Sequence, residues 1–135
     1  MSQERYPVLW IGQVAVVTLP EEIDVTNAET VREELLSVMN QGADLLVADM
    51  SKTNFCDSAG VSALVRTFRQ ASAGAGAMRL VVSTPAVQRV LSMTGVDRLV
   101  DIFPSVAASL AGQAQPGQAQ LDNTTATADT DGGGA

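Results

Sequence analysis

The chain has 135 residues, which is enough for one domain with a hydrophobic core, and 46% of them are apolar while only 4% are aromatic. Its formal net charge is −7, so the basic surface that nucleic-acid phosphates require is not expected. With no histidine and a single cysteine, Cys56, the chain cannot form a Ser-His-Asp site, a Cys-His site or an intrachain disulfide.

The first 25 residues predict two strands and a connector. β-branched and apolar residues fill 6–11 and 13–19, and Gly12 lies between the two runs. This pattern is typical of two strands joined by a tight turn. Residues 20–25, which contain a proline and several acids, are then expected to form a connector.

A helix and a buried strand are predicted next. Thr26 and Glu29 have the spacing of a capping box, which makes Thr26 the predicted N-cap of a helix that ends near Asn40. The run 45–50 is too short for a helix and too apolar for a half-exposed strand, so it predicts a central strand covered on both faces. The apolar residues at helical spacing in the first helix are Ala28, Val31, Leu35 and Val38.

The second half of the chain alternates helices and strands. A second helix begins at Ser58, a strand follows at 78–83, and Pro85 opens a third helix. A short edge strand is expected at 99–103, and Pro104 is expected to open a last helix. The apolar face of the second helix is expected to contain Val61, Leu64, Val65 and Phe68.

The order β-β-α-β-α-β-α-β-α predicts an α/β fold with a mixed sheet of about five strands packed against about four helices. We expect this domain to occupy residues 1–112. Residues 113–135 are rich in Gln, Ala, Gly and Thr and carry three acids and no base. Such a composition predicts a disordered acidic tail.

Several functions are disfavoured by what the sequence lacks. Residues 1–7 have no apolar signal core, and no apolar run approaches the roughly 18 residues of a membrane span, which predicts a cytoplasmic protein with no membrane partner. No tight acid cluster suggests a metal site, and no cofactor is expected. Asp49 resembles the aspartate of a response-regulator receiver by position, but the acid pair that a receiver needs after its first strand is missing. We expect no enzymatic activity.

The most informative segment joins the central strand to the second helix. A polar loop after the strand closes on Asp57-Ser58-Ala59-Gly60, where the amphipathic helix begins. Ser58 therefore takes the predicted N-cap position, where its hydroxyl is accessible. A phosphate added there would meet the positive end of a helix, so the segment suggests a switch on a binding surface.

Four separate elements of the chain resemble anti-sigma factor antagonists, whose fold is the STAS (sulfate transporter and anti-sigma factor antagonist) domain. The resemblance covers roughly residues 5–111. The elements that carry it are Glu22-Ile23-Asp24 with Thr26-x-Ala28-x-x-Val31, Asp49-Met50-Ser51 with Phe55-x-Asp57-Ser58-x-Gly60, Ser83-x-Pro85-Ala86-Val87, and Met93-x-Gly95.

The resemblance implies partner switching in a bacterial stress response. The unmodified protein would bind an anti-sigma factor that is also a serine kinase, and the sigma factor would be released for transcription. The kinase, which supplies the Mg-ATP site, would phosphorylate Ser58, and a metal-dependent serine phosphatase would reset the protein. A different possibility is a STAS scaffold, not phosphorylated, that serves as a binding subunit of a sensory or transport assembly.

The resemblance also implies which residues form the site. Ser58 is the expected phosphoacceptor. Each other residue has a structural alternative: a turn or cap role for those in the first loop, a solvated loop position for Lys52, and loop orientation for Asp57. Cys56 is expected to be a buried, inert thiol. The expected partner-binding residues are Asp24, Thr26, Asn27, Lys52, Asp57 and Ser58.

Overall fold

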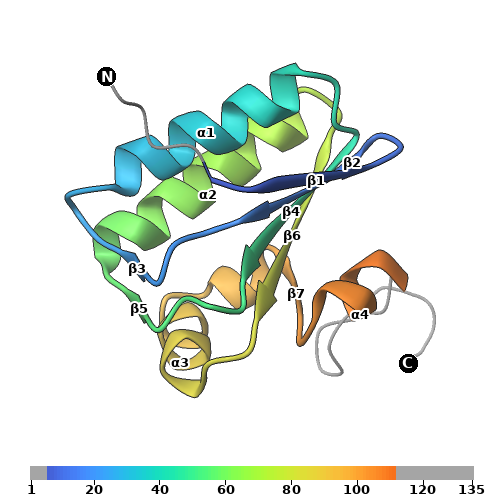
Figure 1. The fold of residues 1–135 in the computed structure, drawn as a ribbon. Helices are drawn as coiled ribbons and strands as arrows, with labels where there is room; N and C mark the ends of the chain where they lie inside the picture. The colour runs from blue at the N-terminus through green and yellow to red at the C-terminus, as the bar shows by residue number, and fades with distance from the viewer. Residues whose placement is uncertain (1–5, 112–135) are drawn as a thin grey trace.

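The computed structural model describes residues 6–111, and the predicted tail at 113–135 lies outside them. The expected order of strands and helices is confirmed, with two short strands added to it (Figure 1). The elements are β1 (Val8–Ile11), β2 (Val14–Thr18), β3 (Glu22–Ile23), α1 (Ala28–Asn40), β4 (Leu45–Met50), β5 (Phe55–Cys56), α2 (Ser58–Ala73), β6 (Ala77–Val82), α3 (Pro85–Met93), the 3₁₀ turn η1 (Val96–Arg98), β7 (Asp101–Phe103) and α4 (Val106–Ala111).

The main sheet has five strands in the order β1-β2-β4-β6-β7. β1 is antiparallel to β2, and the other neighbours are parallel, so the sheet is mixed as predicted. The predicted central strand is β4, which lies in the middle of the sheet with Leu46, Val47 and Ala48 fully buried. The strands β3 and β5 pair only with each other, in a separate parallel sheet.

Helices α1 and α2 lie side by side over one face of the sheet (Figure 1). The predicted apolar stripe of α1 is confirmed, because all four of its residues are buried. On α2, Val61 and Leu64 are buried, whereas Val65 and Phe68 are half-buried at the margin of the core. The sheet residues under the helices include Ala15, Val17, Leu46, Ala48, Leu80 and Val82.

A smaller apolar cluster covers the opposite face, where α4 packs on the sheet. Val16, Val47 and Val81 are buried there, with Val106 of α4 packed against them. Arg79 anchors α4, because its Nη1 donates to the Ser109 carbonyl at 2.5 Å. Within residues 6–111, no helix has both the length and the apolar character that crossing a membrane requires.

Some predicted boundaries were wrong. Residues 20–25 are not only a connector, because they contain β3. The strand predicted at 78–83 runs from Ala77 to Val82. The strand predicted at 99–103 is only β7, since residues 99 and 100 form the turn and bend that follow η1. Pro104 does not open the last helix, which begins two residues later.

Candidate functional site

The pairing of β3 with β5 joins the two segments that contain most of the predicted site. Glu22 lies opposite Phe55, and Ile23 lies opposite Cys56. The Asp57 amide then donates to the Ile23 carbonyl at 3.1 Å. Since α1 follows β3 and α2 follows β5, this pairing holds the N-termini of the two helices next to each other (Figure 1).

Ser58 is the first residue of α2, and the predicted N-cap role of its hydroxyl was wrong. The N-cap is Asp57, whose Oδ1 accepts a hydrogen bond from the Gly60 amide at 3.0 Å. A carboxylate at this position binds the helix amides more strongly than a hydroxyl because its charge also complements the helix dipole. Ser58 is exposed, and none of the hydrogen bonds within residues 6–111 uses its hydroxyl.

Gly60 is buried because α2 begins in close contact with the small sheet. A Cβ atom built on Gly60 would lie 2.7 Å from the Cys56 Sγ and 2.9 Å from the Ile23 Cγ2. Only glycine therefore fits without movement of its neighbours. Cys56 is buried, as predicted, and burial together with the charge of Asp57 raises the pKa of its thiol to about 11.

Asp24 organises the loop between β3 and α1. Its Oδ1 accepts hydrogen bonds from the Thr26 hydroxyl at 2.5 Å and from the Thr26 amide at 2.9 Å. These two hydrogen bonds hold the pKa of Asp24 below its ordinary value, and the bond from the Thr26 hydroxyl has the larger effect. In return, the Asn27 side chain accepts from the Asp24 amide and donates to the Glu22 carbonyl.

The predicted N-cap role of Thr26 was also wrong, because the N-cap of α1 is Asn27. The hydroxyl of Thr26 is engaged by Asp24, so it is not available to the helix amides. Glu29, the other half of the predicted capping box, instead pairs with Arg32 and lies 3.9 Å from the Arg66 guanidinium.

Lys52 lies in the turn between β4 and β5. It is exposed, and within the described part of the chain no ion pair involves it. The turn is held by Thr53, which is fully buried and donates its hydroxyl to the Pro20 carbonyl at 2.8 Å. Sequence reasoning missed Thr53 because a threonine in a polar loop gives no sign of burial.

Two exposed apolar side chains border the predicted site and were also missed. Val25 is 76% exposed in the loop before α1, and Phe55 is 49% exposed on β5. The signal for Phe55 was present, since it is an aromatic residue in a polar loop. The surrounding charges are mostly negative: Glu21 and Glu22 are exposed, and Asp24 and Asp57 are half-exposed. The surface is therefore acidic with apolar projections.

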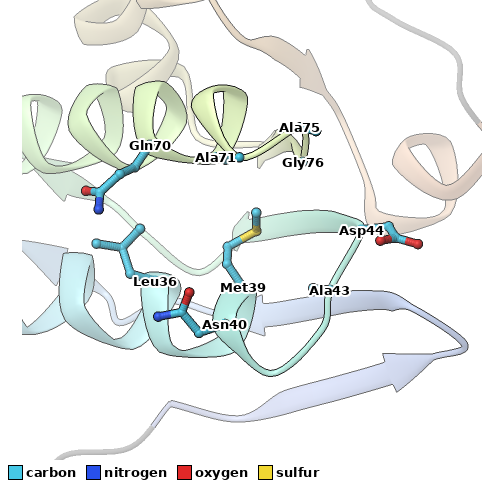
Figure 2. Close-up of a pocket in the computed structure, with 10 residues that line it drawn as sticks. Leu36, Met39, Asn40, Ala43, Asp44, Gln70, Ala71, Ala75 and Gly76 are labelled. Carbon is cyan, nitrogen blue, oxygen red and sulfur yellow. The ribbon is translucent and has the colours of Figure 1, made fainter.

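A cavity of about 250 Å³ lies at the other end of α1 and α2, where the two helices finish (Figure 2). Met39 reaches from α1 toward α2 and contributes to its wall. Gln70, which also lines it, is about 18 Å along α2 from Ser58 at 1.5 Å per residue. This cavity is not part of the Ser58 site, and residues 6–111 contain no group of three or more acids or thiols placed to hold a metal ion.

Comparison with known proteins relates most of the described chain to a single family. Residues 7–109 match the model of the STAS domain. The anti-sigma-B factor antagonist of Bacillus subtilis is 31% identical over 86 residues, which are 64% of this chain and 78% of the relative. The predicted resemblance is thus confirmed at the level of sequence.

Solved structures agree with the fold. An anti-sigma factor antagonist from Mycobacterium paratuberculosis superposes with a TM-score of 0.73 at 26% identity, covering 79% of this chain and 91% of that one. The Bacillus cell fate determinant SpoIIAA, solved in its phosphorylated form, superposes with a TM-score of 0.61 at 20% identity, covering 79% and 97%. The second likeness supports the fold alone.

Proposed function

This chain belongs to the STAS domain family, and on that premise we propose that it is an anti-sigma factor antagonist switched by phosphorylation of Ser58. In its unmodified form it binds an anti-sigma factor serine kinase, and the sigma factor is thereby freed for transcription. The kinase transfers phosphate from Mg-ATP to Ser58, and a metal-dependent phosphatase removes it. The antagonist function is supported by relatives that carry this description.

The observation that carries the proposal is the free hydroxyl of Ser58 at the start of α2. Ser58 is exposed, and Asp57 rather than Ser58 caps the helix. A kinase can therefore modify this oxygen without breaking a bond that stabilises the fold. Ala59 follows Ser58, so the next position offers no competing hydroxyl.

The start of α2 supports the proposal because its free amides suit an added phosphate. The first two amides of α2, those of Ser58 and Ala59, have no acceptor within the helix, and the helix dipole favours a negative charge there. SpoIIAA, which has this fold, exists in a phosphorylated form. We expect phosphorylation to leave the fold intact and to change the surface instead.

The change in the surface is electrostatic. Phosphorylation adds about −1.5 to −2 charges at pH 7 to a region that already contains Asp24 and Asp57. A partner fitted to a neutral hydroxyl must then desolvate a dianion. A loss of about 2–4 kcal/mol of binding free energy is expected, which corresponds to roughly 30- to 1000-fold weaker binding.

The acids around Ser58 define the chemistry of the partner. Glu21, Glu22, Asp24 and Asp57 form an acidic border, and Val25 projects from the neighbouring loop. A complementary partner presents basic side chains around an apolar contact. Asp24, Thr26, Asn27 and Asp57 are proposed to contact the kinase through this border, and Lys52 is proposed to contact its periphery.

The test compares Ser58 with Ser62, an exposed serine one turn further along α2. The protein is incubated with its cognate kinase and Mg-ATP, and the modified residue is mapped by mass spectrometry. Ser58→Ala should bind the kinase and resist modification, and Ser58→Asp should bind at least about 30-fold more weakly. Ser62→Ala and Ser62→Asp should behave as wild type.

Two outcomes would contradict the proposal. Phosphate found on Ser62 but not on Ser58 would show that Ser58 is not the phosphoacceptor. A stable complex that is indifferent to the charge at Ser58 would indicate a constitutive STAS scaffold instead.

A further inference from the structure

β1 forms an edge of the main sheet (Figure 1), and all four of its side chains are exposed. Val8 is 36% exposed, Leu9 57%, Trp10 39% and Ile11 46%. β1 has four residues and contains no charge, proline or bulge, three of the devices that keep an edge strand from pairing. Within residues 6–111 no strand pairs with the outer side of β1, and an apolar edge of this kind is suited to the addition of another strand.

The pairing with β2 determines which backbone groups of β1 are free. The Thr18 amide donates to the Pro7 carbonyl at 2.9 Å, and hydrogen-bonded positions alternate along an antiparallel pair. Leu9, two residues after Pro7, is therefore also bonded to β2. The N–H and C=O groups of Val8 and Trp10 point the other way, toward the open edge.

We propose that two copies of this chain pair through β1 in an antiparallel arrangement with a two-fold axis at Leu9. Val8 of each copy then exchanges N–H to C=O bonds with Trp10 of the second copy, which gives four new hydrogen bonds. Side chains that lie opposite each other in a sheet share a face, so Val8 packs on Trp10 and Leu9 packs on Leu9. The two sheets become one continuous sheet of ten strands.

A second copy fits this edge because the pairing is self-complementary and free of charge repulsion. Each molecule has a net charge of −7, and two such molecules meet most favourably along a segment without acids. Four side chains per copy bury less than the roughly 800 Å² per partner of a standard interface. The dimer is therefore expected at the weak, transient end of specific interfaces.

The proposed dimer is separate from the Ser58 switch. β1 is an edge strand of the main sheet, whereas Ser58 begins α2 beside the small sheet of β3 and β5. The dimer can therefore be tested on the isolated protein, without kinase or phosphatase. Failure of either proposal leaves the other standing.

The test uses sedimentation velocity on the full chain from about 1 to about 500 µM, a range suited to a weak dimer. Trp10 is the only tryptophan, so its emission reports directly on β1. We expect the dimer fraction to rise with concentration while the emission of Trp10 moves to shorter wavelength. A monomer throughout this range, or a dimer with unchanged emission, would overturn the proposal.

Two variants and a control sharpen the test. Leu9→Lys places like charges opposite each other at the two-fold axis and should raise the dissociation constant about tenfold or more. Val8→Pro removes an outward-facing N–H that the hairpin does not use, and should also weaken the dimer. Met93→Lys changes a side chain that is 78% exposed on α3 and should leave the dimer unchanged.

The folded state of each variant is checked by circular dichroism. If Leu9→Lys is unfolded, Val8→Pro decides the outcome. Equal dimerisation of wild type and the folded β1 variants would show that the copies associate through another surface.

Discussion

The Asp57 carboxylate, which immediately precedes the exposed Ser58, caps α2 by accepting a hydrogen bond from the Gly60 amide at 3.0 Å. Replacement of the cap should destabilise the fold without removing Ser58, the proposed phosphoacceptor. We expect Asp57→Ala to lower the free energy of unfolding by about 1 kcal/mol and Asp57→Asn to lower it much less, as measured by urea denaturation. Asp44→Ala, at an exposed aspartate that caps no helix, is the control. Equal effects of all three changes would argue against the cap.

A methyl group at Gly60 should be costly because the N-terminus of α2 contacts the small sheet closely. The added Cβ would lie 2.7 Å from the Cys56 Sγ. We expect Gly60→Ala to lower the free energy of unfolding by about 1–3 kcal/mol, which is the usual effect of overpacking. Gly74→Ala, where the nearest atom would be 3.7 Å away, should change it little.

The same clash can be tested by removing the sulfur. Cys56→Ala in the Gly60→Ala background should recover part of the lost stability, because the clash with the sulfur is removed. The recovery should be incomplete, because the added Cβ still lies close to the Ile23 side chain. If the losses from the two single substitutions simply added, the proposed contact between Gly60 and Cys56 would be contradicted.

The thiol of Cys56 should react slowly in the folded protein. Its pKa is raised to about 11, so at pH 8 only about one thiol in a thousand is a thiolate, and the side chain is buried as well. Iodoacetamide labelling at pH 8 should be much slower than in urea. Labelling at the rate of a free cysteine would contradict the buried position.

The same pKa shift predicts a loss of stability in alkaline solution. The unfolded thiol ionises near its ordinary value of 9.0, while the folded one stays neutral up to about 11. Between these two pH values only the unfolded thiol ionises, and this ionisation stabilises the unfolded state relative to the folded state. The contribution of Cys56 to the free energy of unfolding therefore falls as pH rises. The difference between wild type and Cys56→Ala in urea titrations across this window measures that contribution.

The hydroxyl of Thr26 should control the titration of Asp24. Because its hydrogen bond favours the ionised carboxylate, Thr26→Val should raise the pKa of Asp24, as followed by NMR of the carboxyl carbon. In the folded wild type the pKa is depressed, so its stabilising effect is present above the unfolded value and is lost as pH falls. The same substitution at Thr30, on α1, should leave the titration of Asp24 unchanged.

Apolar periodicity was sufficient to predict the central part of the fold. The stripe of α1 and the buried strand β4 were predicted correctly because each contains enough apolar residues to define a period. The strands β3 and β5 have two residues each and define none. Their pairing is a tertiary contact between segments about 33 residues apart, which a local pattern does not contain.

The exact positions of the two helix caps could not be predicted from the local sequence either. Asp57 and Ser58 are both good capping residues in adjacent positions, and so are Thr26 and Asn27. In each case the observed cap is fixed by a contact with the small sheet or its loop: the Asp57 amide bonds to Ile23, and the Asn27 side chain bonds to Glu22. Local preference predicted each cap to within one residue, and hydrogen bonds to residues of the small sheet decided between the two neighbours.

The short ladder between β3 and β5 has a consequence for the kinetics of recognition. The ladder holds the N-termini of α1 and α2 together in the unbound protein. The loops that lead into these helices therefore lose little conformational entropy on association. Encounter with a partner then resembles the docking of two rigid bodies, and its rate should depend on ionic strength more than on loop rearrangement.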